Sequence, residues 1–184
     1  MREFEIGRIY GLRITATPAV IPGVFIVWIP LAVVGLNVLG LSVPEAMWGG
    51  LIGVALHYAS ELWHHTGHAW AARRTGHPMI GVRFGFLFGV AALSIYPPDE
   101  GDLPAAVHLR RALGGPLFCL LLALAALPIA LAVQRTGGLA YWLAAWLFLE
   151  NLLIYALQGI IPVGFNDGQI VWEWILRRGK GRRA

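Results

Sequence analysis

The chain has 184 residues, of which 58% are hydrophobic and 13% charged, and its formal net charge is +4. Soluble domains carry about 25% charged residues, so this composition excludes a water-soluble surface and requires that part of the solvent is lipid. The basic excess does not indicate nucleic acid, because the basic side chains flank apolar runs as membrane anchors do. The length fits a single domain, and the lone Cys119 excludes an internal disulfide.

Four apolar runs predict an all-α integral membrane protein with about four membrane-spanning helices. A helix needs about 20 residues to cross the hydrocarbon core, and each run is long enough. The second run begins at a helix-start pattern, Ser42-Val43-Pro44-Glu45, and the fourth carries Glu150 near its middle. The predicted spans cover residues 17–41, 44–72, 112–134 and 139–161.

The segment between the second and third spans, residues 75–111, is mixed in character. It contains Gly, a Pro-Pro pair and the acidic residues Asp99, Glu100 and Asp102. Residues 79–96 alternate weakly between apolar and polar, which fits either a small β-hairpin or a shallow membrane segment. We therefore expect a small hairpin or an irregular insertion here.

The distribution of basic residues predicts the orientation. Four spans place thirteen of the fourteen Lys and Arg residues on one side and only Arg135 on the other. Because cytoplasmic loops carry the excess of basic residues, we expect both termini and the insertion to be cytoplasmic. The basic tail, residues 177–184, is expected to lie near anionic lipid.

The second predicted helix carries a polar face inside the membrane. At about 100° per residue, its five ionisable side chains fall within an arc of about 100°. Such groups are costly in lipid and normally face protein or water. A lone histidine would most simply be a polar contact between helices, but two imidazoles at positions i and i+4 can share one metal ion. The five are His57, Glu61, His64, His65 and His68.

The pair His64 and His68 therefore predicts a metal site, and Asp167 is the candidate third ligand. His68 and His64 lie about 7.5 and 13.5 Å of helix from Arg73, in the cytoplasmic half of the membrane. Asp167 follows the fourth span, which ends on the same side. The alternative for Asp167 is a turn or N-cap before a terminal helix over residues 169–177. Histidine and carboxylate ligands favour a zinc-like ion.

Three segments resemble the site-2 protease family of intramembrane zinc metalloproteases. They are His64-His65-Thr66-Gly67-His68, then Leu113-Gly114-Gly115-Pro116, then the stretch from Pro162 to Gly168, and they match the family's H-E-x-x-H, small-Gly-Pro and N-x-x-P-x-x-x-x-D-G motifs in order. The resemblance implies that His64, His68 and Asp167 bind zinc. It also implies a single membrane domain with a site-2-protease-like core over residues 44–176, preceded by an added helix within residues 1–43 and followed by the tail.

Two positions depart from the family pattern. His65 stands where the family has its catalytic glutamate, which acts as general base toward the attacking water, and Gly159 stands where it has an asparagine. His65 could serve as a base or could instead bind the metal and close the site. Glu61, one turn before the histidine pair, and Glu150, at comparable depth, are candidates to replace the missing base.

Three functions follow as alternatives. We expect first a metal-holding homologue without ordinary peptidase activity, a pseudoenzyme that binds or regulates the transmembrane helices of other proteins. The second is an active zinc metalloprotease with a displaced base. The third is a metal or proton conductor along the polar series from His57 to His68, which would require an oligomer because the sequence has no internal repeat. The lipid bilayer is the expected surrounding, and no nucleic acid partner is expected.

Overall fold

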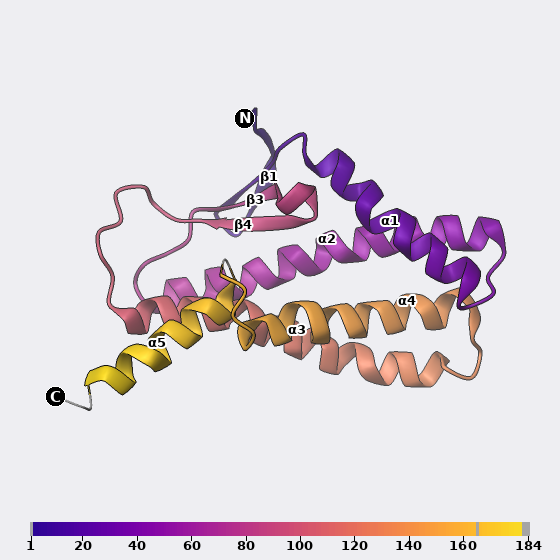
Figure 1. Ribbon diagram of the computed structural model, residues 1–184. Helices are drawn as coiled ribbons and strands as arrows, with labels where there is room; N and C mark the ends of the chain where they lie inside the picture. Colours follow the sequence, from indigo (N-terminus) through magenta and orange to yellow (C-terminus); the bar gives the residue numbers. More distant parts are fainter. Residues whose placement is uncertain (1, 165, 182–184) are drawn as a thin grey trace.

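The computed structural model describes residues 2–164 and 166–181. Its long central helix, α2 (Val43–Arg74), runs through the whole molecule with α1 (Val20–Asn37), α3 (Ala105–Val133) and α4 (Gly138–Leu149) packed around it (Figure 1). A short helix, α5 (Asp167–Gly181), follows near the C-terminus. Each of the four predicted apolar runs therefore contains a helix. The connection between α3 and α4 lies at one end of the bundle, and the segment between α2 and α3 lies toward the other end (Figure 1).

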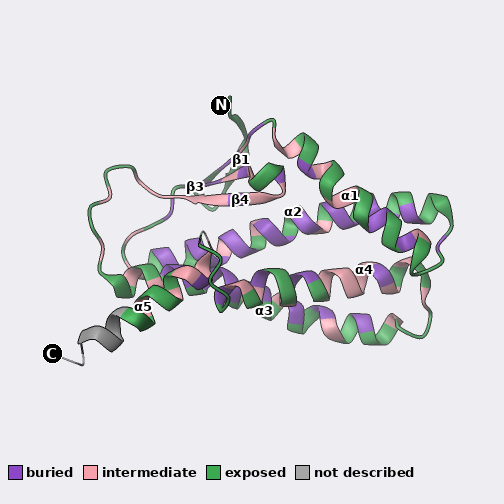
Figure 2. Cartoon of the chain, in the orientation of Figure 1, coloured by how far each residue is buried: buried purple, intermediate pink, exposed green. Residues whose placement is uncertain are grey.

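The start of α2 has the predicted local chemistry. Ser42 and Glu45 form a capping box, in which the Ser42 backbone N–H and hydroxyl both donate to Glu45 Oε2. Pro44 lies in the first turn, where its missing N–H costs no hydrogen bond. Many residues of α2 are buried along its length, whereas the outward faces of α1 and α3 are largely exposed and apolar (Figure 2). This is the pattern of a bundle whose outer helices face lipid.

A four-stranded sheet covers the C-terminal part of α2. Its order is β1 (Phe4–Ile9), β2 (Leu12–Ala16), β3 (Gly81–Phe86) and β4 (Ala91–Ile95), with β2 and β3 parallel and the other pairs antiparallel. A single 3₁₀ turn, η1 (Leu87–Gly89), joins β3 to β4. Apolar side chains of the sheet pack against Ala69 and Ala72 of α2.

The sheet corrects the all-α prediction and resolves the insertion. Residues 81–95 form the β-hairpin that was one of the two alternatives for this segment. The N-terminal strands β1 and β2 were not predicted. Each strand is short, and its charged side chains interrupt the alternation of apolar and polar residues. Tyr10 and Gly11, with φ of 49° and 82°, form the tight turn between them, as type I′ hairpins require.

The fourth apolar run is not one regular helix. Helix α4 ends at Leu149, a π-helix, η2 (Glu150–Ala156), follows, and a 3₁₀ turn, η3 (Leu157–Gly159), ends the run. The uninterrupted helix expected over residues 139–161 is therefore wrong in detail. π-Helical turns are frequent at functional sites, and in this one both Glu150 and Tyr155 are buried in the protein.

Three helices of the described chain are long and apolar enough to cross a membrane. They are Val20–Asn37, Ala105–Val133 and the combined run Gly138–Gly159. Helix α2 has 32 residues but a lower average hydrophobicity, because it carries the ionisable face. The backbone of α5 is described as far as Gly181. The side chains of the predicted basic tail, residues 177–184, lie outside the described part of the structure.

Candidate metal centre

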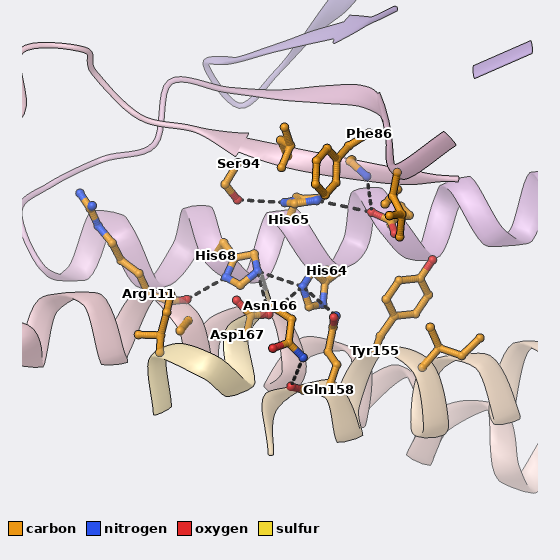
Figure 3. A pocket seen from close by; sticks show the side chains of 18 of the residues that line it. His64, His65, His68, Phe86, Ser94, Arg111, Tyr155, Gln158, Asn166 and Asp167 are labelled. Carbon is orange, nitrogen blue, oxygen red and sulfur yellow. Dashed lines mark hydrogen bonds and ion pairs between the residues drawn. The ribbon is translucent and has the colours of Figure 1, made fainter. Parts of the chain in front are cut away.

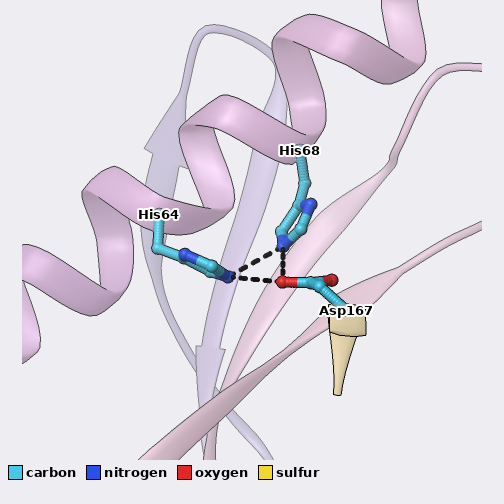
Figure 4. Close-up of side chains that lie close together, drawn as sticks. All are labelled: His64, His68 and Asp167. Carbon is cyan, nitrogen blue, oxygen red and sulfur yellow. Dashed lines mark hydrogen bonds and ion pairs between the residues drawn. The ribbon is translucent and has the colours of Figure 1, made fainter. Parts of the chain in front are cut away.

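Three predicted ligands converge on one point. His64 and His68 lie one turn apart on α2, and Asp167 is the first residue of α5 (Figure 4). The two Nε2 atoms are 2.9 Å apart, and Asp167 Oδ2 lies 3.2 Å from His64 Nε2 and 3.4 Å from His68 Nε2. Atoms bound tetrahedrally to zinc at about 2.0–2.1 Å are about 3.3 Å from one another. The group of three could therefore hold a metal ion.

Glycines at the crossing of α2 and α3 make room for this centre. A Cβ on Gly67 would lie 2.3 Å from the Gly114 carbonyl oxygen, so only glycine allows the two backbones to approach this closely. A Cβ on Gly115 would lie 2.5 Å from both His64 Nε2 and His68 Nε2. The Gly-Gly-Pro motif thus has two functions: Gly114 permits the helix contact, and Gly115 leaves space beside the ligand atoms.

Neighbouring groups orient both imidazoles. His68 Nδ1 lies 2.8 Å from the Arg111 carbonyl oxygen, to which it can donate, and this leaves Nε2 free as a metal ligand. His64 Nδ1 lies 3.6 Å from Cys119 Sγ. Both ligand histidines are buried, with 4% and 5% of their surface exposed. The rings are therefore held with their Nε2 atoms toward the same point.

Asn166 positions the carboxylate of Asp167. Its Oδ1 accepts hydrogen bonds from the backbone N–H groups of Val163 and Gln169, and its Nδ2 donates to the carbonyl oxygens of Gln158 and Ile161. Asn166 is thus the capping residue of α5. Asp167 is both the beginning of that helix, which starts earlier than the expected residue 169, and a member of the ligand group. The alternative reading of Asp167 as the N-cap is therefore wrong, because Asn166 is the cap and Asp167 is the first residue of the helix.

His65 faces away from the three ligands, toward the sheet (Figure 3). Its Nδ1 lies 2.9 Å from Ser94 Oγ on β4, and its Nε2 lies 3.4 Å from Glu61 Oε2. Glu61 Oε2 also accepts the backbone N–H of Ala92 at 3.1 Å, so the carboxylate is tied to the same strand. Within the part of the chain that the structure describes, both nitrogens of His65 thus have partners other than the ligand group.

His57 and Glu150 form a second polar cluster deeper in the bundle. His57 Nδ1 lies 2.5 Å from Glu150 Oε1, and the Tyr155 hydroxyl lies 3.1 Å from the same nitrogen. His57 Nε2 lies 2.7 Å from the Val90 carbonyl oxygen. The prediction that Glu150 points into the bundle is confirmed. Glu150 does not contact the candidate metal ligands. Its partner is His57, which lies almost two turns of α2 away from His64.

A cavity of about 480 Å³ joins these groups. It runs from His57 past His64, His65 and His68 to Arg111, near the start of α3. The polar lining residues that sequence reasoning missed include four that stand alone in an apolar or loop segment: Ser94, Tyr155, Gln158 and Asn166. Gln158 Nε2 lies 3.4 Å from His64 Nε2, so a side-chain amide is present next to Gly159, where the family's asparagine is absent (Figure 3).

An ion pair closes the outer end of the cavity. The buried Arg111 guanidinium donates to both oxygens of Glu100, at 2.8 and 2.6 Å, and to the His77 carbonyl oxygen, and it stacks 4.1 Å over the Tyr96 ring. The hydrogen bonds from Arg111 lower the pKa of Glu100 below its usual range. Because Arg111, on α3, also supplies the carbonyl that holds His68, the ion pair connects Glu100, in the loop before α3, to the metal centre.

Two buried imidazoles and a carboxylate beneath a small sheet, in a bundle of apolar helices, define a metalloprotease-like membrane protein. Comparison with solved structures gives the fold: the site-2 protease from Methanocaldococcus jannaschii matches 96% of this chain and 73% of its own, with a TM-score of 0.61 and 18% identity. The recognition of the site-2 protease family from the three motifs is confirmed, and the chain has that fold.

A sequence relative supports the same assignment. "Putative zinc metalloprotease Rip3" of Mycobacterium tuberculosis, found in two strains, is 33% identical over 131 residues, which are 70% of this chain. The chain spans about a third of the length of these relatives, since the matched part is 32% of theirs. No protein-family model matches the chain.

Proposed function

We propose that this protein is a zinc-holding, site-2-protease-like membrane protein that does not cleave peptide bonds by the family's usual route and instead binds or regulates membrane proteins. The observation that carries the proposal is the position of His65. At the place of the family's glutamate, it is bonded to Ser94 and Glu61, not directed at the ligand group.

The ligand group supports zinc as the metal. Two neutral imidazoles and one carboxylate are a common zinc ligand set, and their spacing fits a tetrahedral arrangement. The M. tuberculosis relative is described as a zinc metalloprotease. Zinc bound by His64, His68 and Asp167 would polarise a carbonyl and acidify a water at the fourth position.

The missing step is removal of a proton from the attacking water. A general base must lie within about 3.2 Å of that proton or reach it through one water. His65 uses both nitrogens elsewhere, and Glu61 is bonded to His65 and to Ala92. Glu150 is paired with His57 in the deeper cluster. Each candidate base thus has another partner, which supports the inactive reading.

An active protease with a displaced base is the second candidate. The observation in its favour is that His65 is not among the three grouped ligands, so a fourth position beside the ion is not closed by it. Glu61 is the base in this case, because it lies one turn before the ligand pair on α2 and lines the same cavity.

Zinc analysis together with a cleavage assay tests the proposal. We expect purified protein to hold about one zinc ion, His64→Ala to lose it and His57→Ala to keep it. With a membrane-helix substrate, the unmodified protein should show no zinc-dependent cleavage, and His65→Glu should gain it. Zinc-dependent cleavage by the unmodified protein that disappears in His64→Ala would establish the second candidate instead.

We further propose that α2 also spans the membrane, in addition to the three candidate spans, and that both termini are cytoplasmic. The five ionisable side chains of α2 are buried, between 4% and 8% exposed, so the helix offers lipid only its other faces. The sheet, α5 and the 75–104 segment lie toward one end of the bundle, and the connection that contains Arg135 lies at the other (Figure 1). Reporter fusions at Gly101 and Gly137 should give opposite signals. Equal signals would contradict four spans.

A further inference from the structure

A second cavity, of about 220 Å³, lies against α2 apart from the metal centre and shares none of its lining residues. One wall is the β1–β2 hairpin, with Leu12 and Ile14, and Phe118 of α3 closes the other side. The remaining wall is α2 itself, through a little more than three of its turns. The members from α2 are Leu62, Thr66, Ala69, Trp70, Arg73 and Arg74.

The lining changes character in one direction along α2. From Leu62 to Trp70 the cavity is apolar, and the Thr66 hydroxyl already donates to the Leu62 carbonyl at 2.8 Å. Arg73 and Arg74 follow, at the end of the helix. The span from Leu62 to Arg74 is about 18 Å, slightly more than half of a hydrocarbon core of about 30 Å. The cavity thus runs from apolar depth to a basic end, as a phospholipid does from tail to headgroup.

The two arginines are available to an anion. Arg73 donates one N–H to the Tyr10 carbonyl, which leaves other donors of its guanidinium, and Arg74 stacks 4.3 Å over the Trp70 ring. Among the described residues, neither forms an ion pair with a carboxylate. Arginine binds phosphate in a bidentate manner, and Trp and Tyr mark the headgroup level of membrane proteins. Trp70 and Tyr10 are 43% and 82% exposed there.

We propose that this cavity binds one anionic phospholipid of the surrounding membrane, with its phosphate at Arg73 and Arg74 and an acyl chain along Leu62, Thr66 and Trp70. Charge complementarity selects the headgroup, and the apolar wall selects a chain. The site does not depend on the metal centre or on the proposed function, so it can be measured in protein with or without zinc.

Native mass spectrometry of the full chain, titrated in detergent with dioleoylphosphatidylglycerol, tests the proposal. We expect one tightly bound lipid, weaker binding of the phosphatidylcholine with the same chains, and about tenfold weaker phosphatidylglycerol binding by the double variant Arg73→Gln with Arg74→Gln. The matched control removes two other basic charges, Arg2→Gln with Arg110→Gln, and should bind as the unmodified protein does. An equal loss in the control would show general attraction and overturn the site.

A second variant keeps both arginines, in case their loss disturbs the Tyr10 turn. Thr66→Leu adds volume inside the cavity and should reduce lipid binding about as strongly while the thermal midpoint is retained. Glycerol phosphate, which has the headgroup chemistry without a chain, should fail to compete. Unchanged binding in Thr66→Leu, or full competition by glycerol phosphate, would show that no acyl chain enters the cavity and would overturn the proposal.

Discussion

Two neighbouring residues of α2, His64 and His65, belong to different regions of the molecule. His64 faces the start of α5, as His68 does. Both imidazoles lie close to the carboxylate of Asp167, the first residue of that helix. His65, with Glu61, faces the sheet and is held by Ser94 on β4. The rings of His64 and His65 are perpendicular, with centroids 5.4 Å apart.

The comparison shows that two identical side chains have different functions because they contact different elements of the fold. Successive residues of a helix point about 100° apart, so His64 and His65 cannot face the same partner. The first side provides three atoms at metal spacing, and the second provides hydrogen bonds to a strand. The predictions below test whether the two sides are as separate as this geometry implies.

The largest expected effect is loss of a ligand. His68→Ala should weaken zinc binding by at least about 100-fold, because only two of the three protein ligands remain. His65→Ala, one turn away on the same helix, should bind zinc nearly as the unmodified protein does. Competition with a chelator of known affinity measures both. Equal losses in the two variants would show that His65 is itself a ligand and that the two sides are one site.

Blocking the space while keeping every ligand should have the next largest effect. In Gly115→Ala, the new Cβ would meet both ligand nitrogens at 2.5 Å, so the rings or α3 must shift. We expect zinc affinity to fall about tenfold or more and the free energy of unfolding to fall by about 1–3 kcal/mol, as for an overpacked core. Gly101→Ala is the control, since a Cβ there meets nothing within 4 Å. Normal zinc binding in Gly115→Ala would contradict the assigned position of the ion.

The parts of the fold and of the candidate metal centre that the sequence predicted are those that depend on local patterns. The α2 ligand pair follows from spacing alone, since positions i and i+4 share a helix face. Asp167 followed from motif order and depth, and the structure brings it to 3.2 Å from His64 Nε2. The hydrophobic lengths also predicted the helices. These features are set by residues close together in the chain or by burial in lipid.

Other features depend on contacts that no single segment encodes. The parallel pairing of β2 with β3 joins residues about 70 positions apart, and the sequence gives no register for it. The direction of His65 depends on Ser94, which lies on a strand that could have been a membrane segment by pattern alone. The sequence does not indicate the π-helix either, because Glu150 and Asn151 are followed by the same kind of apolar residues as those of α4.

Freeing His65 from the strand should have a smaller effect. Ser94→Ala leaves His65 Nδ1 without its partner in a buried site, which should reduce the free energy of unfolding by about 1–3 kcal/mol. Zinc affinity should not change, because Ser94 contacts no ligand of the group. Ser94→Thr, which keeps a hydroxyl, should restore most of the stability. A clear gain of zinc affinity in Ser94→Ala would show that the released imidazole turns to the ion.

The smallest expected effect lies at the outer end of the cavity and depends on pH. The pKa of Glu100 is lowered because the Arg111 guanidinium donates two hydrogen bonds to its carboxylate. A carboxylate with a lowered pKa stabilises the fold above its ordinary value of about 4.3, and this contribution is lost as the pH falls through the lowered pKa. The unmodified protein should therefore melt slightly higher than Glu100→Gln at neutral pH, and the two should converge in acid.

Asp99→Asn provides the matched control, because Asp99 is exposed on the same loop and removal of its charge leaves the pair of Arg111 intact. Its melting temperature should differ from that of the unmodified protein by less than that of Glu100→Gln. Glu100 is also linked to the metal centre, since the carbonyl of its partner Arg111, on α3, holds His68 Nδ1. If that connection transmits the change, Glu100→Gln should lower zinc affinity by a few-fold at neutral pH. An unchanged affinity together with a lowered melting temperature would separate the loop from the metal side of α2 and assign the ion pair to stability alone.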